Sequence, residues 1–355
     1  MDSSVAAALL LEQGYNVIGV TMKMYNYDEV GGNTNREASC CGLDAFNDAR
    51  IVAVKLGIPH YVIDLSEEFN NAVIDNFIKE YTKGRTPNPC VLCNTKIKWG
   101  ELLKKADGLG AEYVATGHYA RIVSDETTKK YRITRSKDTM KDQTYALWGL
   151  RQDAVRRTLF PLGDLLKKEV RDIAAMYELK TATKKESFEI CFITDDNYRR
   201  FLTEQFSKKK INVFTGEIMF DGKVVGKHEG IPFYTIGQRS GIGAFGERVY
   251  VTGIDHINNV VKIGKNDALQ HRSLIASDIN LISLDTIDRP FQVKAMVRYK
   301  DTATQAAIFP EANNTIRVVF DEPKRAITPG QSLVMYQGDE LIGGGIIQNI
   351  VDNSP

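Results

Sequence analysis

The first half of the chain alternates between two patterns of apolar residues. Apolar positions at helical spacing predict helices over 3–13, 45–56 and 67–83. Short apolar runs between them predict strands over 17–22, 60–63 and 113–116. Helices separated by short buried strands are typical of a doubly wound α/β domain with a parallel sheet.

Ligands of such sheets bind where the strands end. Met22 ends one predicted strand, and Gly117 and His118 follow another, so these residues are candidates for a pocket. An ordinary loop is the alternative for all of them, and a lone histidine after a strand is more often structural.

The pattern changes at about Ile211. An Asp221-Gly222 pair between two apolar runs predicts a β-hairpin. Short alternating strands with intervening turns are predicted over 248–255, 259–264, 292–299, 305–309, 315–321, 332–336 and 341–350. These elements indicate β-rich domains in the second half, the last of them a small barrel.

Composition and charge limit the class of protein that the chain can be. A chain of 355 residues is expected to fold as two or three domains, and 43% hydrophobic residues support real cores. The net charge of +1 gives no overall nucleic-acid signal, so a polyanion would have to bind local basic patches. No stretch approaches the ~18 apolar residues that a membrane span needs. Five cysteines, an odd number with Cys40 and Cys41 adjacent, favour a reducing compartment, and we expect a cytoplasmic protein.

The segment 84–99 contains several residues of candidate chemical function. It contains Cys90 and Cys93 in a Cys-x-x-Cys pattern, after Pro87 and Pro89. Extended loop is predicted for 86–89 and helix for 95–105, which places both thiols at the entry of a helix, where the helix dipole favours a thiolate. A reactive thiol pair and metal ligation are both open, and a structural loop with packed cysteines is the alternative.

Cys191 is the other candidate thiol. It lies in an apolar run after Lys184 and Lys185, and by periodicity alone it is a buried cysteine in a strand. Cys40 and Cys41 receive no role.

Several stretches together resemble one family. They are GRTPNPCVLCNTKIK (84–98), ATGHY (115–119), KDQTY (141–145), KKESFEICFI (184–193), YTIGQRSGIG (234–243), VRY (297–299) and TPGQ (328–331). In this order they resemble the tRNA-specific 2-thiouridylases of the MnmA/TrmU type, and the match extends through nearly the whole chain.

The resemblance implies a fold and a reaction. The fold is an ATP-pyrophosphatase domain of the adenine nucleotide alpha hydrolase type, expected over 1–202, a central β-rich domain over 203–272 and a C-terminal β-barrel over 273–355. In the reaction, sulfur replaces the C2 oxygen of the wobble uridine of tRNA. ATP, with Mg²⁺, first adenylates that oxygen, because AMP leaves readily and a carbonyl oxygen does not.

The resemblance also assigns the cysteines. Cys191 would receive sulfur as a persulfide from an upstream relay or a cysteine desulfurase. Cys93 would attack that persulfide to release sulfide, or end in a disulfide with Cys191.

The remaining assignments come from positions that match the family's motifs. Asp2, Ser3, Met22 and Gly117 match positions that contact the nucleotide. Residues expected to face the target base or to contact tRNA are Asn88, Pro89, Cys90, His118, Lys141, Asp142, Gln143, Arg298, Tyr299 and Gln331.

The sequence departs from the family's pattern in two places. Met1 falls inside the family's Ser-Gly-Gly-x-Asp-Ser phosphate loop, so we expect the natural start to lie upstream; ATP binding should be weak without the loop's backbone amides. Cys90 stands where the best-known pattern has Asp. Cys90, Cys93 and Cys191 could therefore hold a [4Fe–4S] cluster, as an alternative to the persulfide. A zinc site would need a fourth ligand such as His118.

Two rival functions remain open. One is another ATP-pyrophosphatase enzyme, such as a tRNA 4-thiouridine or lysidine enzyme or an amidotransferase-like synthetase. The other is a tRNA- or metal-binding protein with impaired ATP turnover.

Overall fold

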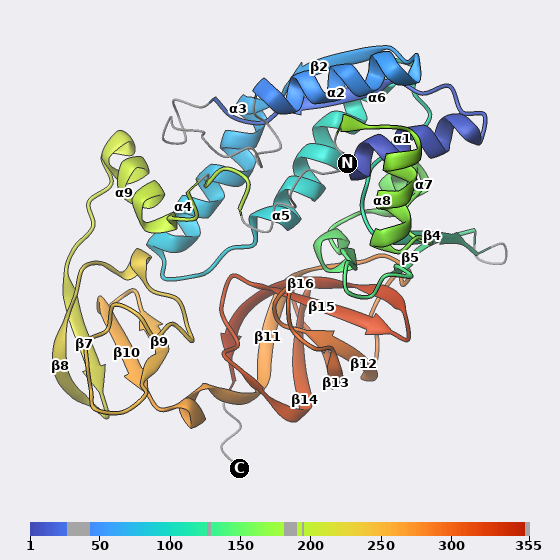
Figure 1. Cartoon of the computed structure of the whole chain (residues 1–355). Helices are drawn as coiled ribbons and strands as arrows, with labels where there is room; N and C mark the ends of the chain where they lie inside the picture. The colour runs from blue at the N-terminus through green and yellow to red at the C-terminus, as the bar shows by residue number, and fades with distance from the viewer. Residues whose placement is uncertain (27–42, 126–128, 181–189, 194, 352–355) are drawn as a thin grey trace. The chain divides into compact units, whose positions relative to one another are not determined.

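A computed structural model describes residues 1–26, 43–125, 129–180, 190–193 and 195–351. The chain divides into two compact units (Figure 1). The first contains 1–73, 90–198 and 339–341, and the second contains 74–89, 199–338 and 342–355. No helix within the described ranges is long and apolar enough to cross a membrane.

The first unit has the α/β architecture that the sequence predicts. Its parallel strands pair in twos: β1 (Gly19–Lys23) with β2 (His60–Asp64), and β3 (Val114–Ala115) with β6 (Thr158–Leu159). The helices α1 (Asp2–Glu12), α2 (Leu43–Leu56) and α8 (Lys167–Met176) contribute to one hydrophobic core. That core contains Val5, Ala6, Val52, Tyr119, Leu162, Val170, Ala174 and Leu179.

Two long helical segments run through π-helical stretches. The first joins α3 (Ser66–Phe69), η2 (Asn70–Ile74) and α4 (Asp75–Thr82), close to the predicted 67–83. The second joins α5 (Pro89–Leu92), η3 (Cys93–Glu101) and α6 (Leu102–Gly108). The predicted helix start at 95 was therefore wrong, because Pro89 begins the helix: its fixed φ suits the first turn, where the missing N–H is not needed.

Shorter elements complete the first unit. They are the hairpin of β4 (Ala120–Ser124) and β5 (Tyr131–Arg135), followed by η4 (Thr144–Leu147) and α7 (Gln152–Arg156). The start of β16, at Glu340 and Leu341, pairs with β5. Cys191 lies in a turn, so the strand expected from the apolar run was also wrong.

After 74–89, the second unit continues from Arg199 with α9 (Tyr198–Lys209) and a small sheet. This sheet contains β7 (Gly216–Phe220), β8 (Lys223–His228), β9 (Tyr250–Asp255) and β10 (Val260–Gly264) in the order β8-β7-β10-β9. Asp221 and Gly222 have φ of 47° and 75°, as a tight hairpin turn requires, which confirms the predicted hairpin. The 3-10 turns η6 (Ile231–Phe233) and η7 (Asn266–Leu269) accompany the sheet.

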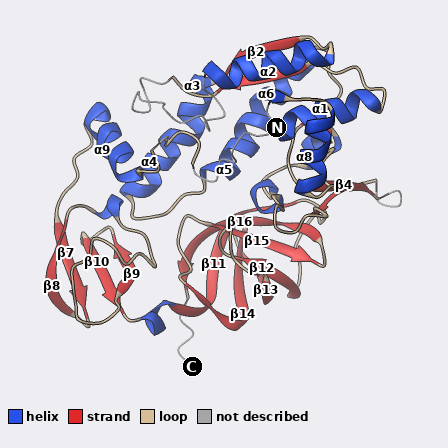
Figure 2. Cartoon of the chain, viewed as in Figure 1, coloured by secondary structure: helices blue, strands red, loops and turns tan. Residues whose placement is uncertain are grey.

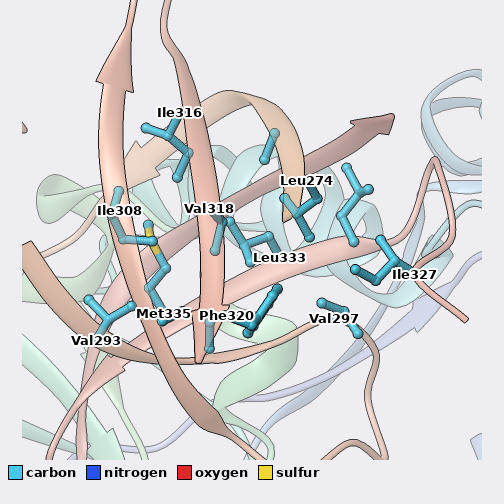
Figure 3. Packing of buried hydrophobic residues seen from close by; sticks show 14 of the residues in the cluster. Leu274, Val293, Val297, Ile308, Ile316, Val318, Phe320, Ile327, Leu333 and Met335 are labelled. Atoms are coloured by element: carbon cyan, nitrogen blue, oxygen red, sulfur yellow. The ribbon is translucent and has the colours of Figure 1, made fainter. Parts of the chain in front are cut away.

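The C-terminal strands close into a barrel. They are β11 (Gln270–Leu281), β12 (Phe291–Met296), β13 (Thr304–Glu311), β14 (Thr315–Arg325), β15 (Ser332–Gln337) and β16 (Glu340–Ile350). Figure 2 shows these strands in red, and antiparallel pairing of β11 with β16 completes the closure. Alternate side chains fill the interior, among them Leu274, Val318, Phe320 and Met335 (Figure 3). The predicted barrel is confirmed, and the domain limits proposed at 202 and 272 stay predictions.

Candidate active site

The loop after β3 passes directly against the start of α1. A Cβ atom on Gly117 would lie 2.7 Å from the carbonyl carbon of Asp2 and from the amide nitrogen of Ser3, so only glycine allows this approach. Three of the residues expected at the nucleotide are thus adjacent. Met22 stands near the end of β1, opposite Ile63 of β2.

A lysine that the sequence did not suggest lies at the corner where Gly117 meets Asp2 and Ser3. Lys167 Nζ lies 2.8 Å and 2.9 Å from the two carboxylate oxygens of Asp2, and the hydroxyl of Tyr119 donates to the same carboxylate at 3.2 Å. The lysine side chain is only 11% exposed. Asp2 and Lys167 are 165 residues apart, and no local pattern could have paired them.

His118 is neutral and held at both ring nitrogens. Its ring packs against Trp99 and Phe160, with centroid distances of 5.6 Å and 5.9 Å. Nδ1 lies 2.7 Å from Thr116 Oγ1 and Nε2 lies 3.4 Å from Lys98 Nζ. Because an ammonium can only donate, Nε2 accepts and Nδ1 carries the proton. Burial, with the Lys98 charge, lowers the pKa of His118 well below its usual range. Both nitrogens are occupied, which argues against the zinc ligand considered from the sequence.

The 141–143 segment is tied to the same loop. Gln143 Oε1 accepts the backbone N–H of Tyr119 at 2.9 Å, and the N–H of Gln143 donates to the Tyr119 carbonyl at 2.9 Å. Asp142 accepts from the N–H of Ser136 and the hydroxyl of Thr144. Burial raises the pKa of Asp142. The side chains of Asp142 and Gln143 therefore hold their own segment in place, and contact of 141–143 with tRNA stays a prediction.

The helix formed by α5 and η3, which we call the cysteine helix, carries two thiols that differ in exposure. Cys90 is exposed and Cys93 is half-buried, one turn further along. The Sγ atom of Cys93 lies 3.9 Å from Met24 Sδ, just beyond the end of β1. Asn94, which follows, is buried and donates to the carbonyl of Ala146.

Cys191 is anchored to the residue next to Met24. The hydroxyl of Tyr25 donates to the backbone carbonyl of Cys191 at 2.8 Å. The ring of Phe69 contacts both Tyr25 and Phe192, which follows Cys191. Consecutive residues at the end of β1 thus contact Cys93 and Cys191, which are almost a hundred positions apart in sequence. The apolar character of Met24 and Tyr25 gave no signal of this role.

The chemical state of the thiols corrects two expectations. Surrounding protein and the neighbouring Cys93 raise the pKa of Cys90 even though its surface reaches solvent, whereas the helix entry was expected to favour a thiolate. Cys90, Cys93 and Cys191 are all free thiols in this structure, so the Cys93–Cys191 disulfide implied by the family resemblance is absent from the state described.

The cluster alternative has no support in this geometry. No group of His, Cys, Asp or Glu within the described residues is arranged to hold a metal ion. Because Cys90, Cys93 and Cys191 are all described, they do not form the ligand set that a [4Fe–4S] cluster needs.

The barrel carries a further group of candidate residues. Tyr299 is 47% exposed at a turn, and Arg298 donates to the carbonyl of Arg325. The carboxylate of Asp301 accepts the N–H of Val297 at 3.1 Å and pairs with Lys324 at 2.8 Å. This ion pair, about nine-tenths buried on both sides, fixes the turn that presents Tyr299.

Asn88, Pro89 and Gln331 also lie in the second unit, whereas Cys90, Cys93 and Cys191 lie in the first. Cys40, Cys41, Lys184 and Lys185 lie outside the described residues.

The fold and these residues define a class: an α/β nucleotide-binding type of domain with two linked thiol positions, extended by β domains. Family models match in the same order, described as a tRNA methyl transferase HUP domain over 1–195, a tRNA methyl transferase PRC-barrel domain over 200–265 and an aminomethyltransferase beta-barrel domain over 271–347.

Curated relatives name the family. The chain is 48% identical to the tRNA-specific 2-thiouridylase MnmA of Salinibacter ruber over 99% of its length and 92% of the relative's. It is also 48% identical to the enzymes of the same name from Pelotomaculum thermopropionicum and Clostridioides difficile, over 99% and 98% of this chain and 96% and 95% of theirs. The chain belongs to the tRNA-specific 2-thiouridylase family, and membership fits the use of ATP.

Proposed function

We propose that this protein replaces the C2 oxygen of the wobble uridine of tRNA with sulfur, at the expense of ATP. The observation that carries the proposal is the pair of contacts at the end of β1: Met24 with Cys93 and Tyr25 with Cys191. A sulfur relay needs two thiols that can meet, and these contacts tie both to one short segment.

The nucleotide is assigned to the corner of Asp2, Ser3 and Gly117. The first N–H groups of a helix have no partner within the helix and suit phosphate, and no side chain caps the start of α1. Gly117, which packs against Asp2 and Ser3, adds no side chain there. Lys167 adds a positive charge beside it. Mg²⁺ enters with the triphosphate, whose oxygens supply ligands that this cation prefers.

The chemistry then proceeds in two steps. The uridine O2 attacks the α-phosphorus of ATP, and pyrophosphate leaves. Cys93 attacks the inner sulfur of a Cys191 persulfide, which forms a Cys93–Cys191 disulfide and releases hydrosulfide. Hydrosulfide adds to C2 and AMP leaves with the former O2. The disulfide must be reduced by an external thiol before the next turnover.

Partners follow from this chemistry. The substrate is a tRNA with a wobble uridine, and the sulfur comes from a persulfide-bearing relay protein or a cysteine desulfurase. The reduced thiols suit the cytoplasm, which is part of the same proposal.

Pyrophosphate release tests the first step. We expect release that requires unmodified tRNA with a wobble uridine and that stops when this base is cytidine. Release without tRNA would point to another ATP-pyrophosphatase enzyme. Tight tRNA binding with no release would favour a binding protein.

A further inference from the structure

The short loop 85–88 leads directly into the cysteine helix. It joins α4 to Pro89, the first residue of α5, which is followed directly by Cys90. Two prolines deprive this part of the chain of backbone donors, so it cannot hold itself through its own hydrogen bonds. Its conformation must come from what packs around it.

The barrel supplies most of that support. Gln331 Nε2 donates to the carbonyl oxygens of Thr86 and Pro87, at 3.0 Å and 3.1 Å. The N–H of Thr86 donates to the carbonyl of Pro329 at 2.9 Å. A Cβ atom on Gly330 would lie 2.9 Å from the Thr86 carbonyl oxygen, so the turn 328–331 contacts the loop backbone to backbone.

Other parts of the second unit hold the neighbouring positions. Arg85 pairs with Glu80 at 2.6 Å and donates to the Ile347 carbonyl at 3.2 Å, and its side chain is 21% exposed. Thr86 Oγ1 donates to Thr235 Oγ1 at 3.2 Å. The loop is therefore restrained on several sides, and Gln331 holds the carbonyls of Thr86 and Pro87 within it.

We propose that Gln331 is a positioning residue for the cysteine helix. Both hydrogens of its amide nitrogen are used on the loop, so this nitrogen cannot also donate to RNA. The side-chain oxygen Oε1 has no donor among the residues that the structure describes, and it is the atom that can accept from a nucleotide. A tRNA that contacts Gln331 would thereby stiffen the loop that leads to Cys90 and Cys93. The link from this loop to catalysis rests on the proposed function, but the restraint on the loop does not.

The test separates positioning from tRNA contact by working without tRNA. In Gln331→Glu the side chain keeps its shape but presents oxygens to two carbonyl groups, and in Gln331→Met it cannot donate at all. We expect either variant to change the alkylation rate of Cys93 about fivefold in tRNA-free protein, because the start of its helix is no longer fixed. Peptide mass spectrometry that distinguishes Cys93 from Cys90 measures this rate.

A second readout follows the loop itself. Hydrogen exchange at the Thr86 amide should accelerate about tenfold in both variants, because the partner on the barrel turn is less firmly held. With tRNA, kcat for thiolation should fall about tenfold while KM for tRNA changes less than about twofold. Gln337→Glu, an exposed position on the same barrel, serves as the matched control and should leave the alkylation rate, the exchange rate, kcat and KM unchanged.

Unchanged alkylation and exchange in both folded variants, together with a raised KM for tRNA, would overturn the proposal and leave Gln331 as a tRNA contact. Failure of the proposed function is a separate result. It would appear as full thiolation by Cys93→Ser, whereas the alkylation and exchange rates of the Gln331 variants do not depend on that outcome.

Discussion

At the scale of single residues, the Asp2–Lys167 pair is the least expected part of the site proposed for the nucleotide. Lys167→Met should remove the cation that pairs with the Asp2 carboxylate, next to the proposed phosphate position. We expect kcat/KM for ATP in tRNA-dependent pyrophosphate release to fall about tenfold, equivalent to about 1.4 kcal/mol. Lys168→Met, at an exposed neighbouring position, is the control. Equal activity of the two variants would show that Lys167 does not contribute to ATP use.

His118 makes a second prediction at this scale. Folding lowers its pKa, so below the usual value of 6.5 the unfolded chain binds more protons than the folded one. Stability should therefore rise with pH up to about 6.5 and be lost as the pH falls below it.

Burial lowers the pKa of His60 and His228 in the same way, so the slope must be compared between variants. Urea unfolding between about pH 7.5 and about pH 5.5 should show a shallower dependence for His118→Phe than for the wild type. The phenyl ring keeps the contacts with Trp99 and Phe160 but does not titrate. An unchanged slope would mean that His118 is not held neutral by the fold.

At the scale of elements, Gly117 joins the loop after β3 to the start of α1. Gly117→Ala should push these two apart, because the new Cβ has no space against Asp2 and Ser3. We expect a loss of about 2 kcal/mol in unfolding free energy and a strong reduction in ATP-dependent turnover.

Gly108→Ala is the matched control for this change. Gly108 ends α6, and a Cβ there meets nothing within 4 Å. It should fold with unchanged or slightly higher stability. Similar stability of the two variants would contradict the close approach at Gly117.

A further prediction concerns the reactivity of Cys90 in the cysteine helix. Since burial and Cys93 raise the pKa of Cys90 above its usual value of 9.0, this thiol should remain largely protonated near neutral pH and alkylate slowly, and its rate should still be rising at pH 9.0. A pH series of iodoacetamide labelling of the wild type, with Cys90 and Cys93 distinguished by peptide mass spectrometry, measures it. Rapid labelling of Cys90 at pH 7 would contradict the environment described for it.

Local patterns predicted most elements but not their partners. Apolar spacing found the helix that forms α2, and Asp221-Gly222 found its hairpin, because both signals lie within a few residues. The helix start at Pro89 was missed because the proline-rich run 86–89 was expected to be extended. In the structure, Pro89 already belongs to the helix. The turn at Cys191 was missed because its apolar neighbours pack on aromatic rings from distant segments.

At the scale of the whole molecule, the order of motifs predicted the family and the α/β and barrel architectures. It could not predict the partners of Asp2, Cys191 or Gln331, because each lies more than a hundred residues away. Gln331, expected to contact tRNA, also holds the loop before the cysteine helix, and its contact with tRNA stays a prediction. The roles of these residues depend on tertiary contacts that leave no periodic trace in sequence.

The central claim is that Cys93 and Cys191, and not Cys90, carry sulfur to the wobble uridine. The direct measurement is mass spectrometry of nucleosides from unmodified tRNA after incubation with ATP, a persulfide donor and each of Cys90→Ser, Cys93→Ser and Cys191→Ser. We predict 2-thiouridine at near wild-type amounts with Cys90→Ser and less than about one-hundredth with either of the others. Full thiolation by Cys93→Ser or Cys191→Ser would contradict the account.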